Sequence, residues 1–167
     1  MQKVRFIFKI TLLLVLFLFQ LTSCHTLRKM YKGEELPPSK IAILAREYGL
    51  HTIYFDGIEC KYGDDKYRAW EIEPGIHIIV VWLNTAGQTV TIIESKDIVE
   101  LSFYAKPGKF YAMSYKIESS KDWIPYIVES DEPLHYVNWP VLYIDDEKIK
   151  GKEIISTIIS RKMRSWF

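Results

Sequence analysis

The sequence predicts an all-β protein, a sandwich of seven or eight strands. From residue 37 onward, short segments rich in Ile, Val, Tyr, Phe and Trp recur about every ten residues, as they do in sandwiches and barrels. Gly, Pro and Asp stand between these segments, where the backbone has to reverse. Apolar residues make up 49% of the 167 residues and aromatic residues 14%, so the chain can bury the core that a sandwich needs.

The amino-terminal residues have the composition of an export signal. Lys3, Arg5 and Lys9 give a positively charged start, and Ile10 to Phe19 is an uncharged apolar run of ten residues. A signal peptide has an apolar region of this length, whereas a membrane-spanning helix needs about 20 such residues. We therefore expect residues 1–23 to be a lipoprotein signal peptide that is removed from the mature protein.

Cys24 stands directly after this signal, in the sequence Leu21-Thr22-Ser23-Cys24. These residues resemble the lipobox of bacterial lipoproteins, in which small residues precede a cysteine that is acylated and becomes the first residue of the mature chain. The resemblance implies that lipid on Cys24 holds the protein on a membrane, and two or three acyl chains on one cysteine anchor a protein stably. The alternatives are a plain membrane anchor or an ordinary secretory signal in which Cys24 has no role.

Cys60 is the second of the two cysteines. When Cys24 is acylated, Cys60 has no partner for an intramolecular disulfide, although the compartment would permit one. We expect Cys60 to act as a small apolar residue in a buried or half-buried place. A reactive thiol or an intermolecular disulfide are the alternatives.

The mature chain has the length of one ordinary domain. Residues 24–36 are mixed and without period and are predicted to form a tether, residues 37–129 the β-sandwich, and residues 130–167 a C-terminal extension. The chain has 22 basic and 21 acidic residues, and removal of the three cations in the signal leaves a net charge of −2. This balance provides no basic field for nucleic acid, so no nucleic-acid partner is expected.

The expected strands cover residues 40–45, 50–55, 67–72, 76–83, 88–94, 98–105, 110–117 and 123–128. The turn signals between them are Asp56-Gly57, Gly63-Asp64-Asp65, Pro74-Gly75, Thr85-Ala86-Gly87 and Pro107-Gly108-Lys109. Asp56-Gly57 has the sequence of a type I′ hairpin turn. Residues 76–83 are apolar at nearly every position, which predicts a central strand buried on both faces. Residues 98–105 alternate, which predicts a strand buried on one face.

Several of these segments, taken in order, carry a resemblance. They are Tyr31-x-Gly33-x-x-Leu36-Pro37-x-Ser39-x-Ile41-Ala42, Asp56-Gly57, Pro74-Gly75-x-His77-x-Ile79-x-Val81, Phe103-x-Ala105-x-Pro107-Gly108-x-x-Tyr111 and Trp123-Ile124-Pro125-Tyr126-Ile127-Val128. Together they resemble a group of small bacterial lipoproteins of unknown function, over roughly residues 31 to 129. The segment that begins at Pro74 is also similar to PEGA-type domains, which are envelope-associated β-sandwich modules. The resemblance implies an immunoglobulin-like or transthyretin-like sandwich on a lipid tether and assigns no reaction, ligand or cofactor.

The extension divides into two parts. His135 to Ile144 is predicted to be one more strand, which Pro140 confines to an edge or breaks in two. From Lys152 onward apolar residues recur at helical spacing (Ile154, Ile155, Ile158, Ile159 and Trp166), which predicts a short amphipathic helix. This helix would pack on the sandwich, in a partner's groove or at a lipid interface.

No catalytic, metal or cofactor motif is found in the sequence. His25, His51, His77 and His135 do not have the spacing of metal ligands, and no phosphate-binding loop or nucleophile elbow occurs. His77 lies at the start of a predicted buried strand, where we expect its imidazole to bond a backbone carbonyl.

Three functional hypotheses follow from these observations. The leading one is a non-catalytic structural or interaction module of the bacterial envelope. The second is a small-ligand or glycan binder that uses exposed aromatic residues among Tyr104, Tyr111, Tyr115, Trp123, Tyr126, Tyr136 and Trp139. The third is an enzyme whose site is assembled from His77, Asp56 or Cys60. Because the residue after Cys24 is His25 and not aspartate, the sorting pattern of enteric lipoproteins favours the outer membrane.

Overall fold

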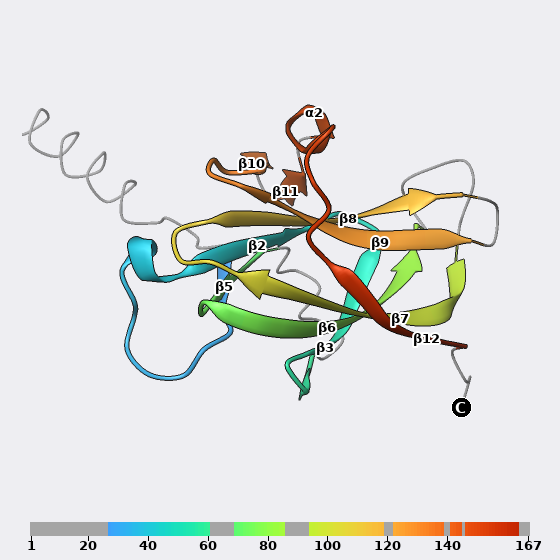
Figure 1. Ribbon diagram of the computed structural model, residues 1–167, viewed down its shortest axis with the longest axis horizontal. Coiled ribbons are helices and arrows are strands. Elements are labelled where there is room, and N and C mark those ends of the chain that lie inside the picture. The colour runs from blue at the N-terminus through green and yellow to red at the C-terminus, as the bar shows by residue number, and fades with distance from the viewer. Residues whose placement is uncertain are drawn as a thin grey trace, which may run out of the picture.

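The protein is a sandwich of two five-stranded β-sheets, in a computed structural model that describes residues 27–60, 69–85, 94–118, 122–138, 141–144 and 146–163 (Figure 1). The predicted all-β sandwich is confirmed. Across sheet A the strands are β1 (Leu27–Lys29), β5 (Ala69–Ile72), β2 (Ala42–Arg46), β8 (Phe110–Ile117) and β9 (Trp123–Ser130). Across sheet B they are β12 (Thr157–Met163), β7 (Glu94–Ala105), β6 (Gly75–Asn84), β3 (Leu50–Phe55) and β4 (Ile58–Glu59).

The remaining elements are short. A 3-10 helix, η1 (Pro38–Lys40), precedes β2, and a single helical turn, α2 (Asp146–Ile149), precedes the last strand. A separate hairpin is formed by β10 (His135–Asn138) and β11 (Val141–Ile144). Of the two alternatives predicted for residues 135–144, the break into two strands is confirmed: β10 ends at Asn138 and β11 begins at Val141.

The two sheets bury their facing side chains in one main core cluster. Its large members, all 3% exposed or less, include Leu44, Phe55, Trp70, Ile72, Leu101, Met113, Trp123 and Ile127. Trp123 also donates its indole N–H to Ser95 Oγ (2.6 Å), so its one polar atom is satisfied inside the protein. This shared core holds the sheets together.

The turn at Asp56-Gly57 is confirmed as a two-residue hairpin connection of type I′. Phe55 and Ile58 are paired across the hairpin, and both turn residues have positive φ, 49° for Asp56 and 76° for Gly57. A type I′ turn requires this left-handed conformation at both positions, which Asp and Gly tolerate. The turn therefore fixes where β3 ends.

The prediction that residues 76–83 are buried on both faces is wrong. β6 is central in sheet B, but burial alternates along it: Ile79 and Val81 are fully buried, while Ile76 is 73% exposed. No layer of the described residues covers the second face of this sheet. The predicted alternation over residues 98–105 is confirmed in β7. Of the strand expected at 88–94, residues 88–93 lie outside the described residues, and Glu94 begins β7.

The predicted C-terminal amphipathic helix is wrong. Residues 157–163 form β12, which pairs antiparallel with β7 along the edge of sheet B, with an irregularity between Ile158 and Ser160. β-Branched isoleucines lower helix propensity and favour extended backbone. The long edge of β7 offers unpaired N–H and C=O groups, and pairing with them outweighs the helical spacing.

The predicted tether, residues 24–36, is in part a piece of the sandwich. Residues 27–29 form β1, which pairs in parallel with β5 from Leu27↔Ala69 to Lys29↔Glu71. Tyr31 is buried, and its hydroxyl accepts the N–H of Leu36. The described part of the sandwich therefore includes residues of the predicted tether from Leu27 onward.

Candidate functional site

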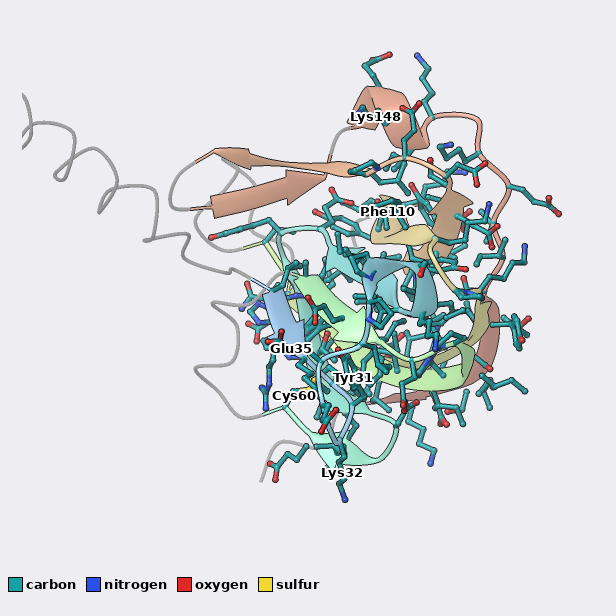
Figure 2. The ribbon with its side chains drawn as sticks, turned by 90° about the vertical axis from the view of Figure 1, so that its left-hand side faces the viewer. Tyr31, Lys32, Glu35, Cys60, Phe110 and Lys148 are labelled. Carbon is teal, nitrogen blue, oxygen red and sulfur yellow. The ribbon has the colours of Figure 1, made fainter. Side chains whose placement is uncertain are left out.

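The predicted lipidation residue, Cys24, lies outside the described residues, as does His25. Cys60 is described, and its half-buried thiol packs against the main core cluster, in agreement with the expected apolar role. In Figure 2 it is labelled beside Tyr31. Among the described residues no helix is long and apolar enough to cross a membrane.

The described residues hold no cluster of three or more His, Cys, Asp or Glu side chains that could bind a metal ion. The imidazole of His51 stacks on the indole of Trp82 with 4.6 Å between ring centroids. His77 lies in β6, and His135 begins β10. The histidines are thus on separate elements.

His77 and Asp56, which are 21 residues apart in the chain, are brought together. The Nδ1 atom of His77 lies 2.6 Å from Oδ2 of Asp56, and its Nε2 lies 2.7 Å from the backbone oxygen of Glu73. The other carboxylate oxygen of Asp56 accepts the N–H of Ile78 (2.8 Å). The expected bond between His77 and a backbone carbonyl is confirmed.

The surroundings of this pair are those of a structural contact. The His77 side chain is buried, with ring centroids 5.3 Å from Phe55 and 5.6 Å from Phe103. Both ring nitrogens face oxygen atoms of the protein, so neither is directed at an open cavity. The pair links the β3–β4 turn to the connection between β5 and β6. Sequence reasoning named both residues but missed their contact, which depends on the pairing of β3 with β6.

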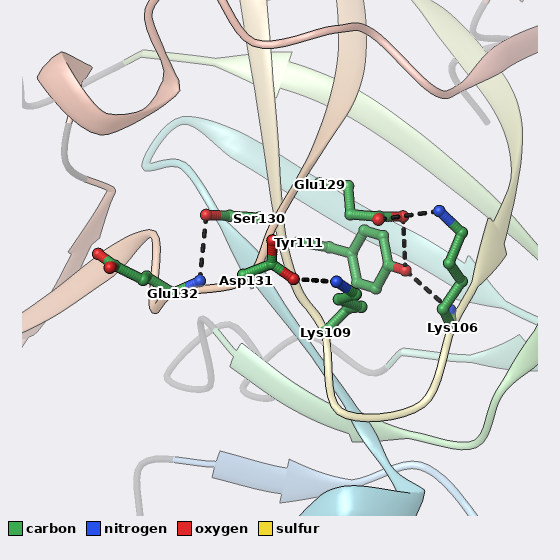
Figure 3. A network of polar contacts seen from close by, with 7 residues as sticks. All are labelled: Lys106, Lys109, Tyr111, Glu129, Ser130, Asp131 and Glu132. Atoms are coloured by element: carbon green, nitrogen blue, oxygen red, sulfur yellow. Dashed lines mark hydrogen bonds and ion pairs between the residues drawn. The ribbon is translucent and has the colours of Figure 1, made fainter.

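A second polar network joins sheet A to the loop between β7 and β8 (Figure 3). The hydroxyl of Tyr111 accepts the N–H of Lys106 (2.8 Å) and donates to Glu129 (3.1 Å), and Lys106 Nζ lies 2.9 Å from the same carboxylate. This arrangement is similar to the tyrosine corner of Greek-key sandwiches. Burial raises the pKa of Tyr111 to about 12; the Glu129 charge adds to the rise, and the Lys106 N–H opposes it.

The outer face of sheet A is covered by the extension. Small residues of the sheet pack with Leu134 and Ile149 in a second cluster (Ala45, Ala69, Ala112 and Val128). Segment 154–156 then runs along β9: Val128 bridges to Ile154, and the Ile155 N–H donates to the oxygen of Ile127 (2.9 Å). In Figure 1 the hairpin and α2 lie above this sheet.

A groove of about 710 Å³ remains between sheet A and this cover. Ile124, Tyr126 and Val128 line its sheet side, and Ile149 and Ile154 line the other. Charged residues of both signs surround it, namely Glu47, Lys116, Glu118, Glu147, Lys150 and Lys152. The volume and the mixture of apolar and polar lining are typical of small-molecule sites.

Within the described residues, part of the outer face of sheet B is exposed and apolar, next to the polar Ser102 and Glu100 of β7. Along β6, Ile76 is 73% exposed and Ile78 40%; on the neighbouring strands Tyr104 is 56% exposed and Tyr54 42%. Strand pairing places Ile76 opposite Tyr104, and Tyr54 opposite Val80, so these residues form one contiguous band. Single exposed apolar residues are ordinary, but a contiguous band is typical of an interaction surface.

The aromatic residues proposed for ligand recognition divide between the core and the surface. Tyr111 and Trp123 are buried, Tyr115 and Tyr126 are half-buried at the groove, and Tyr104 is exposed on sheet B. The side chains of Tyr136 and Trp139 lie outside the described ones. In comparisons with protein families, with curated proteins and with solved structures, no match to this chain was found.

Proposed function

We propose that this protein is a lipid-anchored lipoprotein of the bacterial envelope, in the outer membrane, whose sandwich acts as a non-catalytic interaction module. Cys24 carries the acyl chains that hold it on the membrane. The outer face of sheet B binds another envelope component, a protein or a glycan. The enzyme hypothesis is less well supported, because both nitrogens of His77 contact protein oxygens.

The observation that carries this proposal is the bare apolar band on sheet B. A β-sheet of a sandwich needs one buried face, and sheet B has it in the main core cluster. The second face costs free energy when it is left in water, and Ile76 and Tyr104 are more than half exposed there. A partner that covers the band would recover about 25 cal/mol for each Å² of apolar surface removed from water.

The anchor is tested by growing cells with radiolabelled palmitate. The native chain is expected to incorporate label and to partition into detergent, and the variant Cys24→Ser should do neither. Mass spectrometry of the N-terminal peptide then shows whether the acyl groups are on this cysteine. An unmodified Cys24 thiol, or a mature chain that keeps residues 1–23, would contradict the anchor.

The interaction surface is tested by crosslinking in detergent-solubilised membranes followed by co-purification. The double variant Ile76→Ser/Tyr104→Ser is expected to lose the crosslinked partner. Ile117→Ser, which changes an apolar residue at the end of β8 that is 43% exposed, serves as the control and should retain it. Equal recovery of the partner with both variants, or no partner from the native chain, would count against the surface.

A second candidate function is the binding of a small ligand or glycan in the groove between sheet A and the extension. Its support is the groove itself, where the half-buried ring of Tyr126 lies among charged side chains. Native mass spectrometry of protein purified from its own cells should then show a bound small molecule. Tyr126→Ala should release this molecule, while Tyr104→Ala, on the other sheet, should retain it.

A further inference from the structure

We infer that the sandwich lies edge-on against the bilayer, with the side that carries β1 turned toward the lipid headgroups and the β10–β11 hairpin as a second contact. This inference rests on the proposed acylation of Cys24. It specifies which surface of the sandwich faces the membrane, and therefore which surfaces remain accessible to partners.

The first argument is the short reach of the anchor. Two residues, His25 and Thr26, separate Cys24 from the first residue of β1. Three residue steps span at most about 10 Å even when fully extended. Leu27 is thus held within about 10 Å of the acylated cysteine, a distance similar to the thickness of the headgroup region.

The second argument is that β1 is firmly part of the body. Its three residues pair with β5, and the N–H of Met30 donates to the oxygen of Glu71 (2.9 Å). Leu27 packs against the second cluster and Met30 against the main core cluster. The distance between Cys24 and the folded body can therefore increase only if these contacts break. The side on which β1 lies consequently has to stay near the membrane.

One exposed basic residue of this side suits anionic headgroups. It is Lys32, directly after β1, and Glu34 and Glu35 are exposed beside it. Within β1 itself, Nη1 of Arg28 is buried and Nζ of Lys29 donates to the backbone oxygen of Gly33. A basic side chain near an anionic membrane surface is attracted to it. Lys32 is labelled in Figure 2 on the segment that leads away from β1.

The hairpin supplies the second contact. It belongs to neither five-stranded sheet, and in Figure 2 it projects to the left, the side on which β1 lies. The eight residues of β10 and β11 include two tyrosines and no Lys, Arg, Asp or Glu. Tyrosine is enriched at headgroup depth, and a two-stranded hairpin has open edges that the hydrocarbon core does not tolerate. The hairpin therefore suits the interface and not the interior of the bilayer.

The same geometry keeps the outer face of sheet B away from the lipid. β1 belongs to sheet A, and two packed sheets are about 10 Å apart. An anchor that reaches about 10 Å from β1 cannot also place the far side of sheet B on the bilayer. The band around Ile76 and Tyr104 consequently stays accessible to a partner in the envelope.

The test measures bilayer depth at single labelled sites in the full acylated protein. Cys60→Ser provides the background, and a fluorescent probe is attached at Lys32→Cys or Asn138→Cys on the side predicted to face the membrane. Ile76→Cys and Ile159→Cys, on sheet B, are the controls. The proteins are placed in phosphatidylcholine–phosphatidylglycerol vesicles that contain headgroup spin-labelled lipid. Circular dichroism checks that each variant is folded.

The expected result is quenching at least threefold stronger at Lys32 and Asn138 than at Ile76 and Ile159. Equal quenching at the four sites, or stronger quenching on sheet B, would overturn the edge-on orientation while leaving the anchor intact. A protein without acyl chains on Cys24, which fails to join the vesicles at all, would instead contradict the proposed function. The two failures are therefore distinguishable.

Discussion

The outer faces of the two sheets differ in what covers them. On sheet A, Leu134 and Ile149 of the extension pack over small residues and are buried. On sheet B, Ile76 and Tyr104 stand more than half exposed. Both faces carry apolar side chains, so composition alone does not explain why one of them is covered.

The difference comes from the path of the extension. After β9 the chain passes over sheet A as the hairpin and α2, and then follows the edge of β9. It reaches sheet B at the edge strand β12, and its described residues do not cross that sheet's outer face. An apolar face that the described chain leaves bare is the place where an external partner gains most, and our proposal rests on this contrast.

The largest loss of stability is expected when the packing of the extension on sheet A is weakened. Leu134→Ala removes a side chain that is 1% exposed and leaves a cavity, so it should lower the free energy of unfolding by about 3 kcal/mol. Ile78→Ala, on the outer face of sheet B, is the matched control and should cost less than about 1 kcal/mol. Urea unfolding measures the free energy of unfolding of both variants. Equal losses would contradict the difference between the two faces.

The network that joins Tyr111 of sheet A to the β7–β8 loop should depend on pH. The native state holds this proton up to about pH 12, whereas an unfolded tyrosine loses it near pH 10. The contribution is therefore complete below pH 10 and is lost as pH rises toward 12, and it amounts to about 2 kcal/mol. In urea unfolding at pH 9 and pH 12, Tyr111→Phe should show a smaller decrease in stability than the native chain. An unchanged decrease would show that Tyr111 is not the group responsible.

In sheet B, the Asp56–His77 contact should contribute more to stability than the exposed side chains of the outer face do. Asp56→Ala removes the acceptor for His77 and for the N–H of Ile78, and it should cost about 1.5 kcal/mol. Asp56→Asn keeps an acceptor and tolerates positive φ, so its loss should be clearly smaller. Thermal unfolding separates the two variants. A loss for Asn as large as that for Ala would mean that the charge, and not the turn geometry, is essential.

The smallest effect on stability is expected on the band itself. Ile76→Ser replaces a side chain that is 73% exposed, and it should change the free energy of unfolding by less than about 0.5 kcal/mol. The same variant should nevertheless weaken binding of the partner. A loss above 1 kcal/mol would show that Ile76 is packed within the protein, which would remove the contrast between the sheets.

Local chemistry was enough to predict much of the sandwich. The bounds of β3 and β8 are those expected from the sequence; turn signals stand directly after β3 and directly before β8, and they act over a few residues. Asp56-Gly57 specifies its own turn type. The half-buried role of Cys60 and the carbonyl contact of His77 also followed from residue type and position.

The errors arose where the outcome depends on distant parts of the chain. The apolar residues of β6 predict burial on both faces, but burial of the second face needs another segment to cover it. Isoleucines spaced as in a helix instead form β12, because the edge of β7 was available for pairing. The contact between Asp56 and His77 likewise depends on the β3–β6 register. Periodicity within one segment carries no information on which distant segment covers it or pairs with it.

The central claim, that the anchored sandwich binds its partner through the bare face of sheet B, is most directly tested by photo-crosslinking in intact cells. A photoreactive residue is introduced at Ile76 on this face or at the exposed Lys148 of α2, on the opposite side of the protein. We predict a discrete adduct from Ile76 and none from Lys148. Adducts of equal yield from both sites, or none from Ile76 while the chain is acylated and folded, would contradict the claim.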